Sequence, residues 1–136
     1  MPLEFGTDGV RGVANGELTP ELVLALGRAA ARVLGGPFLV GRDTRLSGPL
    51  LQAAFSAGVA AEGAGVVDLG VLPTPGVAFA SARRGWPGAV VSASHNPFPD
   101  NGIKLFGAGG RKLGDGEEET LEAELGRLAA GAEVGD

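Results

Sequence analysis

A loop near residue 95 collects side chains that can do chemistry. After the apolar run Ala89-Val90-Val91 the chain reads Ser92-Ala93-Ser94-His95-Asn96-Pro97, which places two hydroxyls, an imidazole and a carboxamide in one segment. Lys104 follows ten residues after Ser94, within an apolar segment that we expect to be the next strand. A nucleophilic hydroxyl at the end of a strand, with a cation brought back beside it, suits chemistry on a phosphate group.

Other interpretations of this loop stay open on the residues alone. Ser94 and His95 do not form a hydrolase pair, because neighbours in sequence usually direct their side chains apart. No G-x-S-x-G elbow surrounds either serine, which disfavours an esterase. The loop could instead be a polar turn in which serine and asparagine bond to their own backbone. Ser92 suits a capping or supporting role.

Composition limits the class of protein. A chain of 136 residues with 44% hydrophobic residues can bury the core of one soluble domain, residues 1–136. It has no apolar run of about 18 residues, the length of a membrane helix, and no secretory signal pattern, so we expect a cytoplasmic protein with no membrane partner. The absence of cysteine excludes disulfides and thiolate chemistry.

The charge balance bears on partners. A net charge of −5, with no stripe of lysine and arginine, disfavours nucleic acid as a partner. The same charge would repel a phosphorylated substrate, so binding must come from local cations such as Arg11 and Lys104 and from backbone N–H groups. Much of the excess acid lies in residues 117–124, where a solvent-facing side of a helix explains it.

Hydrophobic periodicity predicts alternating helices and strands. The expected helices cover residues 20–34, 50–62, 74–84 and 115–130, and the expected strands cover residues 38–40, 66–69, 88–91 and 103–106. Thr19 and Thr74 are expected to cap two helices, and Asp115 with Glu118 forms a capping-box-like start for the last one. The glycine-rich segment 107–112 lacks the spacing of a phosphate-binding Walker loop, so a hairpin turn is expected there.

This alternation predicts an α/β fold with three layers, α/β/α. Ligands of such sheets gather beyond the carboxyl ends of the strands. The loops that follow Val40, Leu69 and Val91 should therefore share one edge of the sheet.

Three segments resemble the first domain of the α-D-phosphohexomutases, in the same order and over nearly the whole chain. They are Phe5-Gly6-Thr7-Asp8-Gly9-Val10-Arg11-Gly12, Gly41-Arg42-Asp43-Thr44-Arg45-Leu46-Ser47-Gly48 and Ser92-Ala93-Ser94-His95-Asn96-Pro97. Within that superfamily, the opening joined to the serine loop is most similar to the bacterial phosphoglucosamine mutases. The resemblance implies a mixed, mostly parallel sheet in which one strand runs against the others.

The resemblance also implies roles for single residues. Ser94 matches the serine that carries a phosphate in these enzymes, and Arg11, between Gly9 and Gly12, matches an active-site arginine. Flanking glycines let the backbone approach an anion closely, and a guanidinium forms two parallel hydrogen bonds to a phosphate group. Lys104 could neutralise phosphate charge or move the proton of a sugar hydroxyl, or it could be an exposed strand lysine.

The remaining candidates have supporting roles. His95 could bond the phosphate or hold the loop, Asn96 is expected to fix the loop, and Thr7 to shape the first motif. Arg42, Asp43 and Arg45 fit an active-site role and a salt-bridged loop brace equally well.

The implied reaction interconverts glucosamine 6-phosphate and glucosamine 1-phosphate through a 1,6-bisphosphate, a step toward cell-wall precursors. The implied Mg²⁺ is held by the phosphate on Ser94 and by three aspartates of a second domain, and sugar-reading loops belong to the third and fourth domains. None of those segments is in this sequence, so the chain is expected to be inactive alone. A mutase for glucose or mannose phosphates and a non-catalytic phosphosugar-binding module are the alternatives, with a serine hydrolase behind them.

Overall fold

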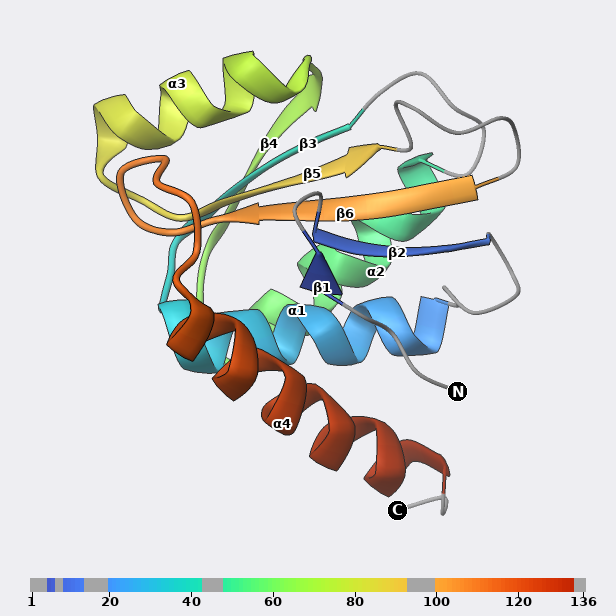
Figure 1. Cartoon of the computed structure of the whole chain (residues 1–136). Coiled ribbons are helices and arrows are strands. Elements are labelled where there is room, and N and C mark those ends of the chain that lie inside the picture. Colours follow the sequence, from blue (N-terminus) through green and yellow to red (C-terminus); the bar gives the residue numbers. More distant parts are fainter. Residues whose placement is uncertain (1–4, 7–8, 14–19, 43–47, 93–99, 134–136) are drawn as a thin grey trace.

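The computed structural model describes residues 5–6, 9–13, 20–42, 48–92 and 100–133, and the side chains within 20–42, 50–91 and 103–128. Helices cover both faces of one sheet of six strands, which is the three-layer architecture that the sequence predicts (Figure 1). The strands are β1 (Phe5–Gly6), β2 (Gly9–Val13), β3 (Phe38–Arg42), β4 (Val66–Val71), β5 (Gly88–Ser92) and β6 (Asp100–Phe106). The helices are α1 (Pro20–Leu34), α2 (Gly48–Ala61), α3 (Thr74–Arg84) and α4 (Asp115–Glu133).

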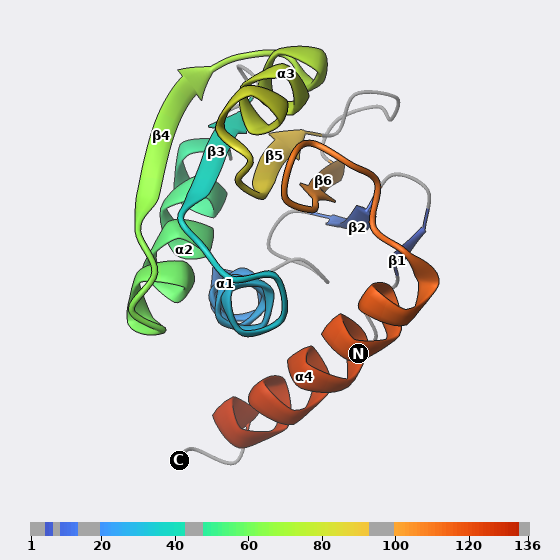
Figure 2. The ribbon, with the colours of Figure 1, turned by 90° about the vertical axis from the view of Figure 1, so that its left-hand side faces the viewer.

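The sheet is mixed, with the strand order β1-β2-β6-β5-β3-β4 that Figure 2 shows across its view. Parallel pairing joins β3 to β4 and to β5, whereas β6 is antiparallel to both of its neighbours, β5 and β2. Most strands therefore point the same way, and β6 is the expected strand that runs against them. The two-residue β1 is antiparallel to β2 and therefore runs in the same direction as β6. Neither β1 nor β2 was predicted as a strand.

Helices α1 and α2 cover one face of the sheet and meet backbone to backbone. A Cβ added to Gly27 would lie 2.2 Å from the carbonyl oxygen of Phe55, and one added to Gly58 would lie 2.1 Å from that of Leu24. Only glycine allows an approach this close, because any larger residue would place its side chain inside the other helix. The position of α1 against α2 is thus set by two glycines.

The core is unequal on the two faces. Between the sheet and helices α1, α2 and α4 lies the larger apolar cluster, in which the Phe38 and Phe55 rings meet edge to face with centroids 5.7 Å apart. Under α3 the buried cluster consists of Val77, Val90 and Phe106, flanked by partly buried residues. Among the described helices none is long and apolar enough to span a membrane.

Two helix starts differ from the prediction. In α3, Pro73 is the N-cap and makes no side-chain cap bond, and Thr74 is already the first helical residue. In α4, the amide of Gly114 donates to Oε1 of Glu117 at 3.0 Å, so the glutamate half of a capping box lies one residue earlier than the expected pair of Asp115 and Glu118, and glycine has no side chain to complete it. Both predictions were off by one residue, because sequence patterns place helix ends only to within one or two residues, and Pro73 and Gly114, which precede the helices, have no capping side chain. Thr19 lies outside the described residues.

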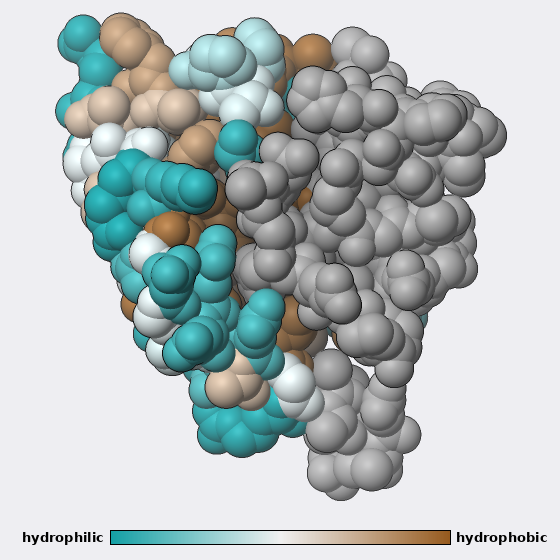
Figure 3. All heavy atoms as spheres, viewed as in Figure 1, coloured by the Kyte–Doolittle hydropathy of each residue, from teal (hydrophilic) through white to brown (hydrophobic). Residues whose placement is uncertain are grey.

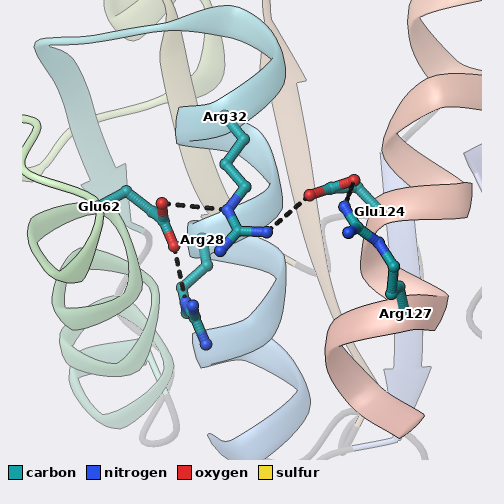
Figure 4. A network of polar contacts seen from close by, with 5 residues as sticks. All are labelled: Arg28, Arg32, Glu62, Glu124 and Arg127. Carbon is teal, nitrogen blue, oxygen red and sulfur yellow. Dashed lines mark hydrogen bonds and ion pairs between the residues drawn. The ribbon is translucent and has the colours of Figure 1, made fainter. Parts of the chain in front are cut away.

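Ion pairs tie α1 to α2 and α4 (Figure 4). This arginine–glutamate network comprises Arg28, Arg32, Glu62, Glu124 and Arg127. Nε of Arg32 lies 3.0 Å from Glu62 and its Nη1 lies 2.7 Å from Glu124, while Nε of Arg28 donates to Glu62 at 2.8 Å and Arg127 pairs with Glu124. Hydrogen bonds from Arg32 and Arg28 lower the pKa of Glu62. The sequence analysis had explained Glu124 as part of a solvent-facing side of a helix. In the structure it also pairs with Arg32 of α1 and with Arg127.

The described surface near the start of α4 is mainly hydrophilic. In the view of Figure 3, hydrophilic residues cover much of the left-hand side, where the turn before α4 and its first residues lie. The guanidinium of Arg111 in this turn bonds both carboxylate oxygens of Glu117, at 2.6 and 2.7 Å. This paired fork anchors the turn to the first residues of α4.

Candidate active site

The carboxyl ends of β3, β4 and β5 meet at one edge of the sheet. Because these strands are parallel and adjacent, the segments that leave them after Arg42, Val71 and Ser92 begin side by side (Figure 1). The three strand ends from which the expected loops depart therefore share one edge. It is the edge at which α/β sheets of this type bind ligands.

Strand pairing brings the first and third sequence motifs together at that edge. Arg11 of β2 lies opposite Gly102 of β6, and Gly102 lies opposite Ser92 of β5. Adjacent strands are about 4.8 Å apart, so the backbones at residues 11 and 92, with β6 between them, are about 10 Å apart. The sequence motifs that carry Arg11 and Ser94 are thus joined by β6, although some eighty residues separate them in the chain.

Lys104 lies on β6, two residues beyond Gly102 and opposite Val90. Ile103 and Leu105 are buried in the larger core, at 0% and 5% exposure, so alternation turns Lys104 to the opposite, α3 face, as predicted. Its side chain is half-buried there, and its Nζ lies 5.8 Å from the centroid of the Phe106 ring. A cation at this distance is attracted by the ring face, which holds the lysine on the α3 face of β6.

Most other candidate residues fall outside the described part of the chain. Ser94, His95 and Asn96 belong to the segment 93–99 between β5 and β6, and Thr7 lies between β1 and β2. Asp43 and Arg45 are likewise outside it, and Arg11 is described by its backbone alone. The roles of these residues stay predictions, and the structure gives the strand ends between which they lie.

A buried amide that the sequence analysis missed sits just beneath this edge. Gln52 of α2, 6% exposed, accepts a hydrogen bond from Nη1 of Arg42 at 3.2 Å. Its Nε2 donates to Oδ1 of Asp68 at 2.7 Å and to the carbonyl of Val40 at 3.4 Å. We call Arg42, Gln52 and Asp68 the Gln52 hub. It joins β3 to β4 and to the start of α2.

The hub bears on the two interpretations of Arg42. Its guanidinium turns toward α2, whereas Lys104 lies on the α3 face, so the structure does not bring these two cations together. The Arg42 side chain thus hydrogen-bonds a neutral amide rather than the carboxylate that a salt-bridged brace requires, and its active-site role stays a prediction. No sequence signal identifies this partner, because a glutamine in an alanine-rich helix suggests a solvent-facing residue.

Asp68 is held ionised by its neighbours. The amide of Gly70 donates to Oδ1 of Asp68 at 2.7 Å, and this bond, followed by that from Gln52 and by the charge of Arg42, lowers the pKa of the carboxyl group. Gly70 has a φ of 69°, a left-handed conformation that favours glycine. The carboxylate therefore stabilises an unusual backbone turn within β4.

Within the described residues, no three acidic or histidine side chains gather closely enough to hold a metal ion. Asp68, which lies near this edge, is already bonded to the amides of Gln52 and Gly70. The described part of the chain thus offers no group of three such side chains that could serve as a Mg²⁺ site.

Comparison with known proteins identifies the class. Residues 2–131 match the family described as phosphoglucomutase/phosphomannomutase, alpha/beta/alpha domain I. The chain belongs to this family, and it is domain I that it represents. Membership implies Mg²⁺ and a phosphoserine in the full-length enzymes.

Particular relatives narrow the branch within the family. The chain is 62% identical over 128 residues to a phosphoglucosamine mutase of Rubrobacter xylanophilus, and the aligned region covers 93% of this chain and 28% of that protein. It is 56% identical over 138 residues to a phosphoglucosamine mutase of Bifidobacterium adolescentis, over 93% of this chain and 30% of that protein. The chain thus spans about a third of the length of these relatives.

A solved structure agrees with the fold. The crystal structure of a phosphoglucomutase/phosphomannomutase family protein from Burkholderia thailandensis superposes with a TM-score of 0.78 at 33% identity, over 92% of this chain and 30% of that one. The resemblance found in the three sequence motifs is therefore confirmed at the level of the family and its first domain.

Proposed function

We propose that this chain is the phosphoserine-carrying domain of a phosphoglucosamine mutase, which interconverts glucosamine 6-phosphate and glucosamine 1-phosphate. The observation that carries the proposal is the 62% identity, over 93% of the chain, to a relative with that name. The motif that contains Ser94 begins at Ser92, the last residue of β5, and the carboxyl ends of such strands are where α/β sheets bind ligands. The cytoplasm is the proposed location, and phosphosugars and the other domains of the enzyme are the proposed partners.

The proposed chemistry is two phosphoryl transfers through Ser94. In the first, the bond between phosphorus and the serine oxygen breaks, and a bond forms to O1 of glucosamine 6-phosphate, which gives the 1,6-bisphosphate. After the bisphosphate reorients, its 6-phosphate returns to Ser94 and glucosamine 1-phosphate leaves. A phosphoserine suits this task because its uncatalysed hydrolysis is extremely slow, so the group waits until an alcohol is placed in line.

Residues of this chain support both transfers. Arg11 binds phosphate oxygens with its guanidinium, and Lys104 supplies positive charge or, in its neutral form, accepts the hydroxyl proton. His95, Asn96 and Thr7 bind the phosphate or support the loops that carry it. Mg²⁺, held by the phosphate on Ser94 and by aspartates of another domain, would withdraw charge from the transferring group.

A mutase for glucose or mannose phosphates is the second candidate, because the family description and the name of the Burkholderia relative include both sugars. Both activities use the same steps at Ser94. They differ in sugar-reading segments that the resemblance assigns to other domains, so only substrate kinetics separate them. A non-catalytic phosphosugar-binding module is the third candidate.

The test uses the full-length protein purified from its own cells. Phosphopeptide mapping should find one phosphate on Ser94, and steady-state kinetics should favour glucosamine 6-phosphate over glucose and mannose 6-phosphates. Ser94→Ala should abolish turnover, since no group remains to carry the phosphate. Normal turnover by that variant would exclude the phosphoserine mechanism, and a native chain ending near Asp136 with Ser94 unmodified would favour the binding module.

A further inference from the structure

We propose that Gln52 and Asp68 are positioning residues for phosphoryl transfer, which hold the carboxyl end of β3 against the end of β5 where the segment bearing Ser94 begins. This inference rests on the proposed function, because it concerns the placement of Ser94. Neither residue belongs to the motifs that carry the resemblance to the mutases. Their role follows from contacts in the Gln52 hub.

The Gln52 side chain has one orientation that satisfies it. Both hydrogens of its amide nitrogen are used, by Asp68 and by the carbonyl of Val40, and its oxygen accepts from Arg42. A flipped amide would set its nitrogen against the guanidinium and its oxygen against the carboxylate, where neither contact is a hydrogen bond. Gln52 itself is 6% exposed, so its amide depends on these protein partners, although Asp68 lies on the exposed side of β4. The hub therefore fixes the three elements that it joins.

The hub lies at an irregularity in the sheet. The register of β3 against β4 shifts between Val40 and Gly41, so that Val40 pairs with Asp68 but Gly41 pairs with Gly70. Such bulges re-aim the residues that follow them. Asp68 stabilises this bulge through the Gly70 amide, and beyond it the amide of Leu72 donates to the carbonyl of Arg42 at 3.0 Å.

Arg42 connects the hub to β5 through the pairing of the two strands. Arg42 lies opposite Val91, the residue before Ser92, and Ser92 is in the row with Gly102 and Arg11. A shift in the end of β3 would thus move the strand end from which the Ser94 segment departs. A displacement of about 1 Å in a reacting group can cost a hundredfold in rate, so a fixed strand end is what in-line transfer requires.

The first experiment measures kinetics of the full-length protein with glucosamine 6-phosphate. Gln52→Met removes all three side-chain hydrogen bonds at similar volume, and Asp68→Ala removes the acceptor. Each should lower kcat about tenfold to a hundredfold and change KM less than about threefold, because the substrate contacts remain. Asp68→Asn keeps an oxygen acceptor for Gly70 and Gln52, and should restore most of the loss.

A matched control separates positioning from loss of stability. Leu125→Ala removes a buried side chain of α4, far along the fold from the carboxyl edge. Compared at temperatures where each variant is folded, Leu125→Ala should keep the kcat of the unsubstituted protein. Equal losses of kcat in Leu125→Ala and Gln52→Met would overturn the proposal, as would an Asp68→Asn variant as slow as Asp68→Ala.

The second experiment needs no activity. Amide hydrogen exchange of the 136-residue chain should show faster exchange at Gly70 and Leu72 in Gln52→Met, with Leu121 of α4 unchanged. Uniform acceleration across the chain, or none, would overturn the hub as a local constraint. If the full-length protein turns over none of the three sugars while amide exchange at Gly70 and Leu72 becomes faster in Gln52→Met, the proposed function is wrong but the hub is still a local constraint.

If exchange at these amides becomes faster but kcat is unchanged, the positioning role of Gln52 is excluded and the proposed function is not affected.

Discussion

The two faces of the sheet differ in how they are covered. Helices α1, α2 and α4 bury the larger core on one face, whereas α3 alone covers a small cluster around Val77 on the other. Lys104, the described residue with a proposed role in the chemistry, lies on the α3 face. The contrast indicates that most of the apolar burial that stabilises the fold lies on the face covered by three helices. Substitutions of buried residues on the two faces should therefore differ in how much stability they cost.

The largest expected effect is on the three-helix face. Phe55→Ala removes a fully buried ring that meets Phe38 edge to face. We expect the free energy of unfolding to fall by about 3–5 kcal/mol, since both apolar burial and packing are lost. Chemical denaturation followed by circular dichroism measures this. A loss no greater than that of Val77→Ala on the α3 face would contradict the unequal division of the core.

Next comes the glycine contact between α1 and α2. Gly58→Ala places a methyl group 2.1 Å from the carbonyl oxygen of Leu24, so the helices must separate, at a cost of about 1–3 kcal/mol. The control is Gly126→Ala in α4, where an added Cβ meets nothing within 4 Å. There alanine should stabilise the helix by up to about 1 kcal/mol. Thermal melts of the pair should shift in opposite directions, and a shared direction would show that the helices adjust freely.

A smaller effect is expected under α3. Val77→Ala removes two buried methyl groups from the small cluster, which costs about 1.6 kcal/mol at about 0.8 kcal/mol per group. The same denaturation experiment applies. A loss as large as that expected for Phe55→Ala would mean that α3 supports the fold as strongly as the opposite face does.

The smallest effect concerns an ion pair on the surface. The hydrogen bond from Arg111, with that from the Gly114 amide, lowers the pKa of Glu117 from 4.5 to about 2. Because the folded-state pKa is the lower one, this stabilisation is fully present above pH 4.5 and is lost as the pH falls toward 2. Glu117→Gln should lower the free energy of unfolding by less than about 1 kcal/mol at pH 7. The difference in Tm between the two proteins should shrink as the pH falls from 4.5 toward 2, and a constant difference would exclude the titration of Glu117 as its source.

Much of the fold could be predicted because local patterns and tertiary packing agree. The alternation of Ile103, Lys104 and Leu105 gave the correct face for each, and the predicted end of β5 was within one residue of the observed one. Strand β2 was missed because Gly9 and Gly12 have poor strand propensity, and its conformation comes from pairing with β6. That partner is distant in the sequence, so no local pattern reports it.

Some residues of the candidate site could be predicted from the sequence and others could not. Ser94 was found through a motif, and the approach of Ser92 to Arg11 could be anticipated only through a resemblance to known enzymes. The Gln52 hub could not be found at all, since its partners Arg42 and Asp68 come from separate strands. A buried amide is recognised by the groups that surround it, and those are known only once the chain is folded.

The placement of β6 between β2 and β5 has a consequence for the order of folding. Arg11 finds its partner Gly102 some ninety residues later, so during synthesis β2 leaves the ribosome long before the strand that attaches it to the sheet. Contacts this distant in sequence are slow to form, because a long loop must close first. The row that joins Arg11, Gly102 and Ser92 should therefore be among the last parts of the domain to assemble. A nascent chain halted before β6 would hold a parallel sheet of three strands, with the arginine that is proposed to bind phosphate still unattached.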